Sequence, residues 1–356
     1  MDSIITNSYP LHFNKTAYKK LNNFVKENNF SKIIVITDSN TTLLCLEKFY
    51  SKFDKTSETY NISFMPGEKN KNLSTCKDLW TNISELGLDR NSLIINLGGG
   101  VVTDLGGFVA STFMRGIKFI NVPTTLLSMV DASIGGKTGI DLNNIKNQIG
   151  VINNPSMVIV DSDFLDTLTL PELKSGFSEM IKHSLITGNK YWESIKLIDI
   201  NSFYAGNCFY NSILIKSKIV DKDPYEKGLR KILNFGHTFG HALEAATGYS
   251  DRLLHGEGVS IGCLLAFEVS QQLDYCAQEV PSRVRNHFRS IGLKCDLSDI
   301  SGSLPDADGL ISLMAQDKKV RDGVISFIMV RGLGQAFTTR DVDLSVVKSV
   351  LSDALM

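Results

Sequence analysis

The sequence predicts an α/β protein of two domains, in which a mostly parallel sheet covered by helices precedes a mainly helical domain. Three observations predict this arrangement. At 356 residues the chain exceeds what one ordinary core holds. In the first half, short β-branched runs alternate with helical spacing, whereas from about residue 163 strand-like runs nearly vanish and long helical segments take over. We therefore expect one domain at residues 1–162 and a second at residues 163–356.

Five short apolar runs in the first half indicate buried strands. They are Lys32–Thr37, Ile62–Phe64, Ser92–Leu97, Lys118–Val122 and Met157–Asp161. Between the second and the third, Leu73–Leu86 has apolar side chains spaced three or four apart, which predicts a helix. Strands separated by helices imply right-handed crossovers, and therefore a mostly parallel sheet with both faces covered. In such sheets ligands bind beyond the carboxyl ends of the strands.

Helical spacing dominates the second half of the chain. We expect helices at Pro171–Thr187, Phe203–Asp221, Phe235–Thr247, Gly256–Leu273 and Pro281–Ile291, and one late strand at Val324–Val330. In the first half, Gly135, Gly136 and Gly139 indicate a loop.

The charge balance excludes one broad class of partner. Lys and Arg number 37 against 38 Asp and Glu, a formal net charge of −1, which removes the electrostatic case for a nucleic-acid or anionic membrane surface. No apolar run approaches the roughly 18 residues of a membrane span, and Met1–Asn14 lacks the basic and apolar regions of a secretory leader. We expect a cytoplasmic protein.

The six cysteines are scattered along the chain without a C-x-x-C pair. That spacing favours neither a thiolate zinc site nor a redox dithiol. We expect buried free thiols at Cys45, Cys76, Cys208, Cys263, Cys276 and Cys295.

A glycine-rich turn follows the third predicted strand. The strand runs into Gly98, Gly99 and Gly100, and residues 101–107 continue as a helix. In this context backbone N–H groups can point at a phosphate. The third glycine of the G-x-G-x-x-G pattern is absent at its offset. The residues alone leave two interpretations, a nucleotide-phosphate site or a tight structural turn.

Histidines and a carboxylate gather in one region of the second half. Four of the six histidines lie between residues 183 and 255, close to a carboxylate: Glu179, His183, His237, His241 and His255. Glu179 shares a helix face with Lys182 and His183, and His237 and His241 lie one turn apart. We favour a catalytic zinc-type site with an open position over separate structural histidines. The H-x-x-x-H spacing lacks the Glu of the metalloprotease pattern, so peptide hydrolysis is not implied.

Several cations stand in glycine-flanked or polar settings. They are Arg115, Lys137, Lys146, Lys216, Arg230, Lys318 and Lys319. Each alone is most often a solvated surface charge. Arg115 before Gly116 and Lys137 after Gly136 can reach a bound anion without steric obstruction, which favours an anionic ligand.

These motifs together resemble the 3-dehydroquinate synthase family. The resemblance is carried by GGGVVTDLGGFVASTFMRGIKFINVPTTLLSMVDASIGGKTGIDLNNIKNQIG at residues 98–150, GFSEMIKH at 176–183, GLRKILNFGHTFGHALE at 228–244 and LHGEGVSIG at 254–262. The order and separation of these blocks agree from about Asp38 to Lys319. The resemblance implies a Rossmann-like N-terminal domain and a mainly helical metal- and substrate-binding domain.

The activity that the resemblance implies is a carbon–oxygen lyase of the shikimate pathway, on the way to chorismate and the aromatic amino acids. The resemblance implies a homodimer that binds NAD and a divalent metal, usually Zn²⁺ with Co²⁺ as the alternative. It converts 3-deoxy-D-arabino-heptulosonate 7-phosphate into 3-dehydroquinate and phosphate. A hydroxyl is oxidised by NAD, phosphate leaves by elimination, the hydride returns, the ring opens and an intramolecular aldol step closes the carbocycle. NAD is therefore catalytic and not consumed.

The resemblance also implies the residues that bind metal and cofactor. The metal ligands are Glu179, His237 and His255, whose metal polarises a substrate hydroxyl. The NAD contacts are Asp38, Asn40, Glu68, Lys71, Gly100, Val101, Val102, Thr103, Asp104, Thr124, Thr125, Lys137, Lys146, Phe164 and Thr167.

A further set meets the substrate. The phosphate contacts are Arg115, Lys137, Asn147 and Lys182, with Arg115 reaching across the dimer interface, and the carboxylate contacts are Lys216, Arg230 and Asn234. His241 resembles the proton-shuttling histidine, and Asp131 and Glu226 match further active-site carboxylates that join Lys137 and Lys182 in the catalytic set. One of Lys318 and Lys319 reaches the substrate, and Lys318 is favoured. The near-neutral chain is thus cationic where phosphate and carboxylate sit.

Other functions share parts of this pattern. A sibling sugar-phosphate cyclase, such as 2-deoxy-scyllo-inosose synthase or a valiolone synthase, has the same fold, NAD and metal, but its substrate has no carboxylate for Arg230 and Asn234. A metal-dependent oxidoreductase of the glycerol dehydrogenase type shares the architecture and releases NADH. A non-catalytic binding protein would have no use for all the metal and anion ligands together.

Overall fold

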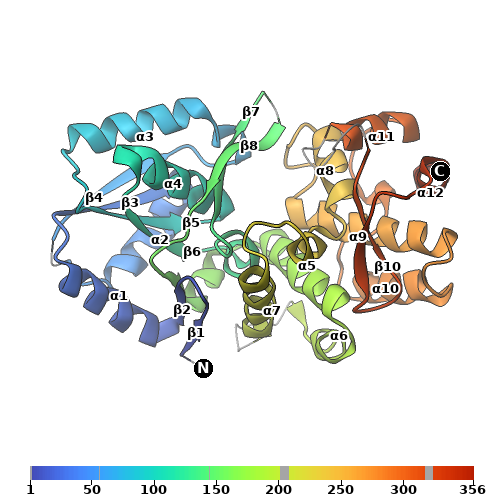
Figure 1. The fold of residues 1–356 in the computed structure, drawn as a ribbon, viewed down its shortest axis with the longest axis horizontal. Coiled ribbons are helices and arrows are strands. Elements are labelled where there is room, and N and C mark those ends of the chain that lie inside the picture. The colour runs from blue at the N-terminus through green and yellow to red at the C-terminus, as the bar shows by residue number, and fades with distance from the viewer. Residues whose placement is uncertain (1, 56, 144, 201–207, 317–323) are drawn as a thin grey trace. The chain divides into compact units, whose positions relative to one another are not determined.

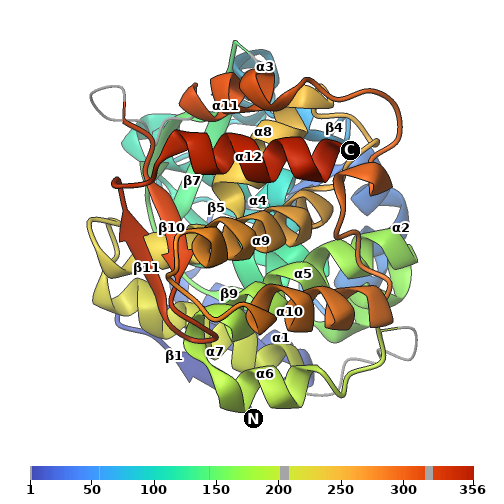
Figure 2. The ribbon, with the colours of Figure 1, turned by 90° about the vertical axis from the view of Figure 1, so that its right-hand side faces the viewer.

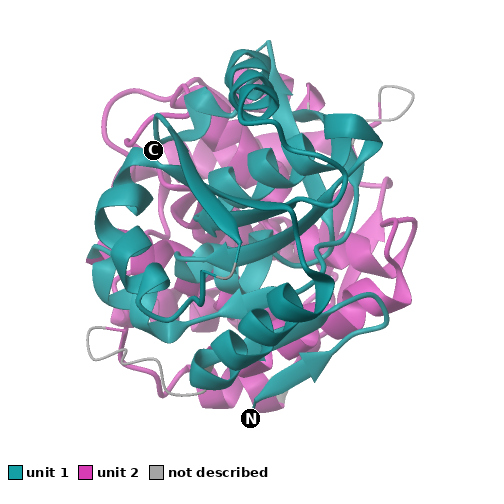
Figure 3. Cartoon of the chain, turned by 90° about the vertical axis from the view of Figure 1, so that its left-hand side faces the viewer, with its two compact units in different colours: residues 1–169 teal, residues 170–356 magenta. Residues whose placement is uncertain are grey.

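The computed structural model describes residues 2–55, 57–143, 145–200, 208–316 and 324–356 (Figure 1). The chain divides into two compact units, residues 1–169 and residues 170–356 (Figure 3). The sequence placed this boundary seven residues earlier, after residue 162. The difference arises because the 3-10 turn Ser162–Thr167 is held by the first unit: Lys48 Nζ donates to the Asp163 carbonyl at 2.7 Å, and Lys52 Nζ bonds the Asp163 carboxylate at 2.7 Å.

A seven-stranded sheet forms the centre of the first unit. Its strands are β1 (Ser3–Ile5), β2 (Pro10–Phe13), β3 (Lys32–Asp38), β4 (Glu58–Phe64), β5 (Leu93–Gly98), β6 (Lys118–Pro123) and β9 (Val158–Val160), in the spatial order β1-β2-β9-β6-β5-β3-β4. Only the β1–β2 pair within this sheet is antiparallel. The expected mostly parallel sheet is confirmed, and β4 starts four residues before the predicted strand.

Helices cover this sheet as its apolar strands require. They are α1 (Asn14–Asn28), α2 (Ser39–Tyr50), α3 (Leu73–Glu85) and α4 (Gly100–Thr112) (Figure 1). Leu79 and Ile83 of α3 and Leu105 of α4 are buried in one cluster with Ile34 and Ile94 of the sheet. Strands that are apolar on both faces need such cover, because each face removes its side chains from water.

The predicted loop at Gly135 to Gly139 is wrong in part. Gly139 lies within β7 (Lys137–Leu142), which pairs antiparallel with β8 (Ile145–Ile152). Glycine weakens strands in general, so its presence favoured a loop. Here Gly139 pairs with Gly150, where each strand presents only a hydrogen toward its neighbour. Gly135 and Gly136 do precede the strand, and both have positive φ.

Helices make up most of the second unit (Figure 2). They are α5 (Leu170–Thr187), α6 (Asn189–Ile195), α7 (Cys208–Lys222), α8 (His237–Ala246), α9 (His255–Gln272), α10 (Glu279–Ser290), α11 (Ala307–Ala315) and α12 (Leu344–Leu355). The hairpin β10 (Phe327–Val330) and β11 (Ala336–Thr339) accompanies them. The five predicted helices correspond to α5, α7, α8, α9 and α10, although the first residues of Phe203–Asp221 lie outside the described residues.

Five of the predicted thiols are buried among the described residues. Cys45, Cys76, Cys263, Cys276 and Cys295 are free and buried, as predicted. Burial raises the pKa of the Cys76 thiol to about 12. Among the described residues, no helix combines the length and apolar character needed to cross a bilayer.

Candidate active site and metal centre

One face of α5 in the second unit carries three buried polar side chains. Glu179, Lys182 and His183 follow at i, i+3 and i+4, and their exposed fractions are 0%, 1% and 0%. Lys182 forms an ion pair with Glu179. His183 Nδ1 lies 2.6 Å from Ser212 Oγ on α7. Buried charges need a paired partner, so this face is built for charge and not for packing alone.

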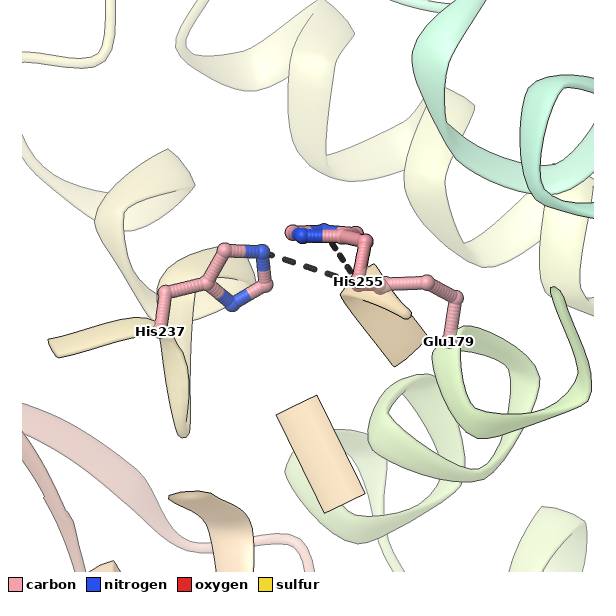
Figure 4. Close-up of side chains that lie close together, drawn as sticks. All are labelled: Glu179, His237 and His255. Carbon is pink, nitrogen blue, oxygen red and sulfur yellow. Dashed lines mark ion pairs between the residues drawn. The ribbon is translucent and has the colours of Figure 1, made fainter. Parts of the chain in front are cut away.

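Two histidines converge on the same carboxylate. His237 Nε2 and His255 Nε2 each lie 3.6 Å from Glu179 Oε1. Figure 4 shows both imidazole rings turned toward Glu179. One ligand atom from each of the three residues lies within 4.8 Å of the other two. The sequence-predicted trio is therefore brought together by three separate helices.

The other ring nitrogens show that this donor set fits a divalent metal. His237 Nδ1 lies 3.2 Å from the Phe235 carbonyl, and His255 Nδ1 lies 3.2 Å from Glu244 Oε1. A carbonyl or carboxylate oxygen accepts a hydrogen bond, which places the hydrogen on Nδ1 and leaves the Nε2 lone pair facing Glu179. Two imidazoles and one carboxylate are a donor set of catalytic zinc sites.

Close packing of glycine brings these helices together. A Cβ on Gly256 of α9 would lie 2.0 Å from the Ser175 carbonyl oxygen on α5. A Cβ on Gly262 of α9 would lie 2.1 Å from the Gly236 carbonyl oxygen at the start of α8. Any side chain at either position would push backbone against backbone. His255 can therefore meet both Glu179 and α8 only because these two residues are glycine.

His241 lies beside the three predicted ligands. It follows His237 by one turn of α8, and its ring centroid is 5.3 Å from that of His237 and 6.2 Å from that of His255. His241 is half-buried, whereas His237 is buried. The structure thus places the predicted proton-shuttling residue next to the three predicted metal ligands.

The predicted carboxylate-binding residues are carried by α7 and by the 3-10 turn Leu229–Asn234 that precedes α8. Lys216 is 6% exposed and Arg230 is 2% exposed. Arg230 Nη1 donates to the Pro224 carbonyl at 2.6 Å, and Asn234 bonds Glu226. Both elements pack against α5.

Sequence reasoning missed Asp223 as an organiser of this loop. Its carboxylate accepts backbone hydrogen bonds from Lys227, Gly228 and Arg230 at 2.9, 2.7 and 3.0 Å. Desolvation raises the pKa of Asp223, but these bonds and the nearby Arg230 charge lower it by a larger amount. The net pKa is therefore below its usual value. The D-P dipeptide was a usable signal, because Asp before a turn commonly binds backbone amides.

The predicted cofactor residues of the first unit gather at the carboxyl edge of the sheet. Asp38 ends β3, Gly98 ends β5 and Thr124 follows β6, and these three strands are adjacent. Thr124 N donates to the Gly98 carbonyl at 3.0 Å. The turn at Gly99 leads directly into α4, so the helix N-terminus and its free N–H groups face this edge.

Further predicted cofactor contacts also lie in the first unit. Val101, Val102 and Thr103 lie in the first turn of α4, and Asn40 lies in the first turn of α2, which Asp38 caps by accepting from Thr41 N at 2.7 Å. Thr125 Oγ1 accepts from Ser128 N. Phe164 is buried, and Thr167 lies 3.9 Å from the Cys45 thiol of α2.

A buried lysine connects Glu68, Asp104 and the β7–β8 hairpin. Lys71 is 3% exposed, and its Nζ donates to Asp104 Oδ2 and Asn147 Oδ1, each at 2.6 Å. Glu68 Oε1 lies 3.7 Å from both Lys71 Nζ and Lys146 Nζ. Burial lowers the pKa of Lys71, but the carboxylates of Asp104, Glu68 and Asp141 outweigh this, and the pKa lies above its usual value.

Removing this charge should destabilise the first unit. Lys71→Met removes the buried ammonium that bonds Asp104 and Asn147, and we expect a loss of about 3 kcal/mol in the free energy of unfolding at pH 7. Because the folded pKa of Lys71 is raised, its contribution is fully present below the unfolded pKa of about 10.4 and is lost as pH rises through the folded value. The difference between wild type and variant should therefore shrink only in strong alkali.

Urea unfolding followed through one tryptophan measures this effect. The chain has two tryptophans, so Trp192→Phe leaves Trp80 of α3 as a probe of the first unit. Lys77→Met removes an exposed lysine of the same helix and is the matched control. Equal midpoints for the Lys71 and Lys77 variants would contradict the structural role of the Lys71 cluster.

Other predicted residues lie elsewhere in the first unit or outside the described residues. Arg115 is exposed and has a positive φ of 68°, and Lys137 is the exposed first residue of β7. Asp131 is half-buried in the helical turn Ser128–Ala132. The predicted substrate residues Lys318 and Lys319 lie outside the described residues.

Comparisons with known proteins identify the family of the chain. The chain matches the family described as 3-dehydroquinate synthase N-terminal over residues 61–175 and the family described as 3-dehydroquinate synthase C-terminal over residues 176–320. The 3-dehydroquinate synthase of Cereibacter sphaeroides is 44% identical over 329 residues, which span 91% of this chain and 89% of the relative. That of Ruegeria pomeroyi is 44% identical over 330 residues, with the same coverage.

Solved structures show the same architecture. A 2-deoxy-scyllo-inosose synthase complexed with carbaglucose-6-phosphate, NAD⁺ and Co²⁺ is 25% identical, with a TM-score of 0.88 and full coverage of both chains. A probable glycerol dehydrogenase from Sinorhizobium meliloti is 15% identical with a TM-score of 0.65, over 98% of this chain and 96% of that chain, and shows the fold alone.

The two family matches are consecutive and together span most of the chain, and the curated relatives share 44% identity over nearly all of it. The chain belongs to the 3-dehydroquinate synthase family and is an enzyme of that type, a lyase acting on phosphates.

Proposed function

We propose that the chain converts 3-deoxy-D-arabino-heptulosonate 7-phosphate into 3-dehydroquinate and phosphate in the shikimate pathway, with NAD regenerated in each turnover. The observation that carries the proposal is the convergence of His237 and His255 on the buried Glu179, which pairs with Lys182. A carboxylate with two imidazoles can bind a metal ion, and the adjacent ammonium can bind an anion.

Glu179, His237 and His255 would hold the divalent metal, for which the donor set favours Zn²⁺ or Co²⁺. The metal, when bound, polarises a substrate hydroxyl, and NAD accepts and then returns a hydride. The contribution of the chain is to fix the three donors on three helices, so that little reorganisation accompanies binding. We propose that His241, beside the donors, receives the proton of the hydroxyl.

The glycine turn and the adjoining strand ends would hold the dinucleotide. The N-terminus of α4 offers backbone N–H groups and the positive end of the helix dipole to a pyrophosphate. Asp38 and Thr124 lie at the same edge of the sheet. The support for this role is the position of the turn at the carboxyl ends of adjacent parallel strands, where such sheets bind ligands.

Cations would position the substrate anions. We propose that Lys182, Arg115, Lys137 and Asn147 receive the phosphate, and that Lys216, Arg230 and Asn234 receive the carboxylate. We propose that Glu226, which bonds Asn234, and Asp131 are further active-site carboxylates. Lys318 and Lys319 remain candidates from the sequence alone. We also propose that the chain forms a homodimer in which Arg115 reaches the active site of the partner subunit.

Arg230→Ala tests the carboxylate assignment. Loss of the buried guanidinium should raise the KM for the heptulosonate phosphate by about 100-fold, because a charge-assisted pair is lost in a dry site. The dissociation constant of NAD should change less than twofold, because the proposed NAD contacts all lie in the first unit. Lys231→Ala removes the neighbouring half-buried cation as a control. Equal losses for NAD and substrate would contradict the assignment.

A sibling cyclase activity is the second candidate, because the 2-deoxy-scyllo-inosose synthase structure matches the whole chain. One assay separates the candidates. The metal-loaded protein and NAD are incubated in three separate reactions with heptulosonate phosphate, glucose 6-phosphate or glycerol. Phosphate release and NADH absorbance are followed in each. Phosphate release from the heptulosonate alone supports the proposal. Turnover of glucose 6-phosphate would favour the sibling, and NADH accumulation with glycerol would favour a dehydrogenase.

A further inference from the structure

We propose that Glu244 is a positioning residue of the metal centre, which holds the His255 ring with Nε2 facing Glu179. The inference rests on the proposed function, since it takes Glu179, His237 and His255 as metal ligands. Glu244 is 3% exposed, and its Oε1 lies 3.2 Å from His255 Nδ1.

The helix geometry of α8 places Glu244 beside the site. His237, His241 and Glu244 follow at i, i+4 and i+7, and therefore share one face of the helix. That face meets the first turns of α9: a Cβ on Gly258 would lie 3.6 Å from Glu244 Cγ. The carboxylate is thus held between two helices and directed at the first residue of α9, which is His255.

The bond fixes which nitrogen of His255 is available. An ionised carboxylate only accepts hydrogen bonds, so the nitrogen that it faces carries the hydrogen. The lone pair then resides on Nε2, the atom that lies 3.6 Å from Glu179 Oε1. A carboxylate partner also makes the imidazole a stronger donor toward a metal, and such partners orient ligating histidines.

His255 depends on this support more than His237 does. The His237 side chain is 9% exposed and its Nδ1 faces the Phe235 carbonyl, a backbone group two residues away. The His255 side chain is 26% exposed, so less packing restrains its ring. The fold itself orients His237, whereas a side chain must orient His255.

Metal affinity is the direct test. Glu244→Ala should weaken the binding of Zn²⁺, measured by competition with a chromophoric chelator, by about 10- to 100-fold. The visible absorption of the Co²⁺-loaded variant should shift, because the His255 ring is no longer held in one orientation. Glu244→Gln keeps an acceptor oxygen but loses the charge, and should weaken binding by less than the Ala variant.

The matched control is Glu257→Gln on the first turn of α9. Glu257 is a partly buried carboxylate two residues from His255, but it bonds Leu254 N and Lys294 and not an imidazole. Its Zn²⁺ affinity and Co²⁺ spectrum should match wild type. Thermal unfolding of each metal-free variant separates loss of folding from loss of metal affinity, since a purely structural Glu244 would lower the midpoint without moving the spectrum.

The outcomes distinguish this inference from the function on which it rests. If wild type binds no metal stoichiometrically, the proposed metal centre is wrong. If wild type binds one ion and folded Glu244→Ala binds it with the same affinity and spectrum, the role of Glu244 is wrong. Should the Ala variant fail to fold, Glu244→Gln decides: weaker binding with a shifted Co²⁺ spectrum supports the proposal, and wild-type values overturn it.

Discussion

Replacement of Glu179 by alanine is expected to abolish metal retention. Glu179 is fully buried and is the carboxylate on which His237 and His255 converge. Loss of a partner of a ligand costs about 10- to 100-fold in metal affinity, and loss of the ligand itself should cost more. Metal analysis after gel filtration should find no stoichiometric Zn²⁺, and turnover should fall to background.

Folding must be separated from metal binding in this experiment. Glu179→Ala removes the carboxylate that pairs with the buried Lys182 ammonium, which costs about 3 kcal/mol or more. Glu179→Ala combined with Lys182→Met removes both members of this ion pair and should regain stability without regaining the metal. Glu172→Ala, an exposed acid in the first turn of α5, is the control. Stoichiometric zinc in the folded double variant would sink the ligand assignment.

Gly262→Val should disrupt the second unit and its proposed metal centre together. The new Cβ would meet the Gly236 carbonyl oxygen at 2.1 Å and Gly240 N at 2.9 Å. Both contacts are backbone, so α8 and α9 must move apart instead of a side chain moving aside. We expect the free energy of unfolding to fall by about 3 kcal/mol, and metal affinity to fall with it, because α8 carries His237 and α9 carries His255.

A glycine one turn earlier provides the comparison. In Gly258→Ala the new Cβ would lie 3.3 Å from the Gly240 carbonyl oxygen and 3.6 Å from Glu244 Cγ. Alanine also favours the helix by up to about 1 kcal/mol, so this variant should stay within about 1 kcal/mol of wild type. Fluorescence of Trp192 in a Trp80→Phe background follows both. Similar stabilities for the two variants would contradict the close approach of the helices.

The sheet was predictable because its signal is local. Lys32–Asp38 and Leu93–Gly98 are continuous apolar runs, as strands buried on both faces must be. The start of α2 also carried a local signal, since Asp38 and Thr41 form a capping box. By contrast, α1 begins after Phe13 without a side-chain cap, so its start left no mark in the sequence.

The donor set was only partly predictable from the residues. The spacing of His237 and His241 along one helix face is local, and it predicted a site. That Glu179 and His255 join His237 depends on contacts between α5, α8 and α9, and the trio came from the family resemblance. Contacts between these helices depend on small residues such as Gly256. The sequence alone does not show which backbone segment packs against such a glycine.

In the proposed reaction NAD is used without being consumed, and the yield of phosphate at limiting NAD measures this property. Metal-loaded protein receives one equivalent of NAD per chain and a hundredfold excess of heptulosonate phosphate. We expect phosphate release to continue to the full amount of sugar, with no lasting NADH absorbance. Release that stops at one equivalent, with NADH accumulated, would contradict it.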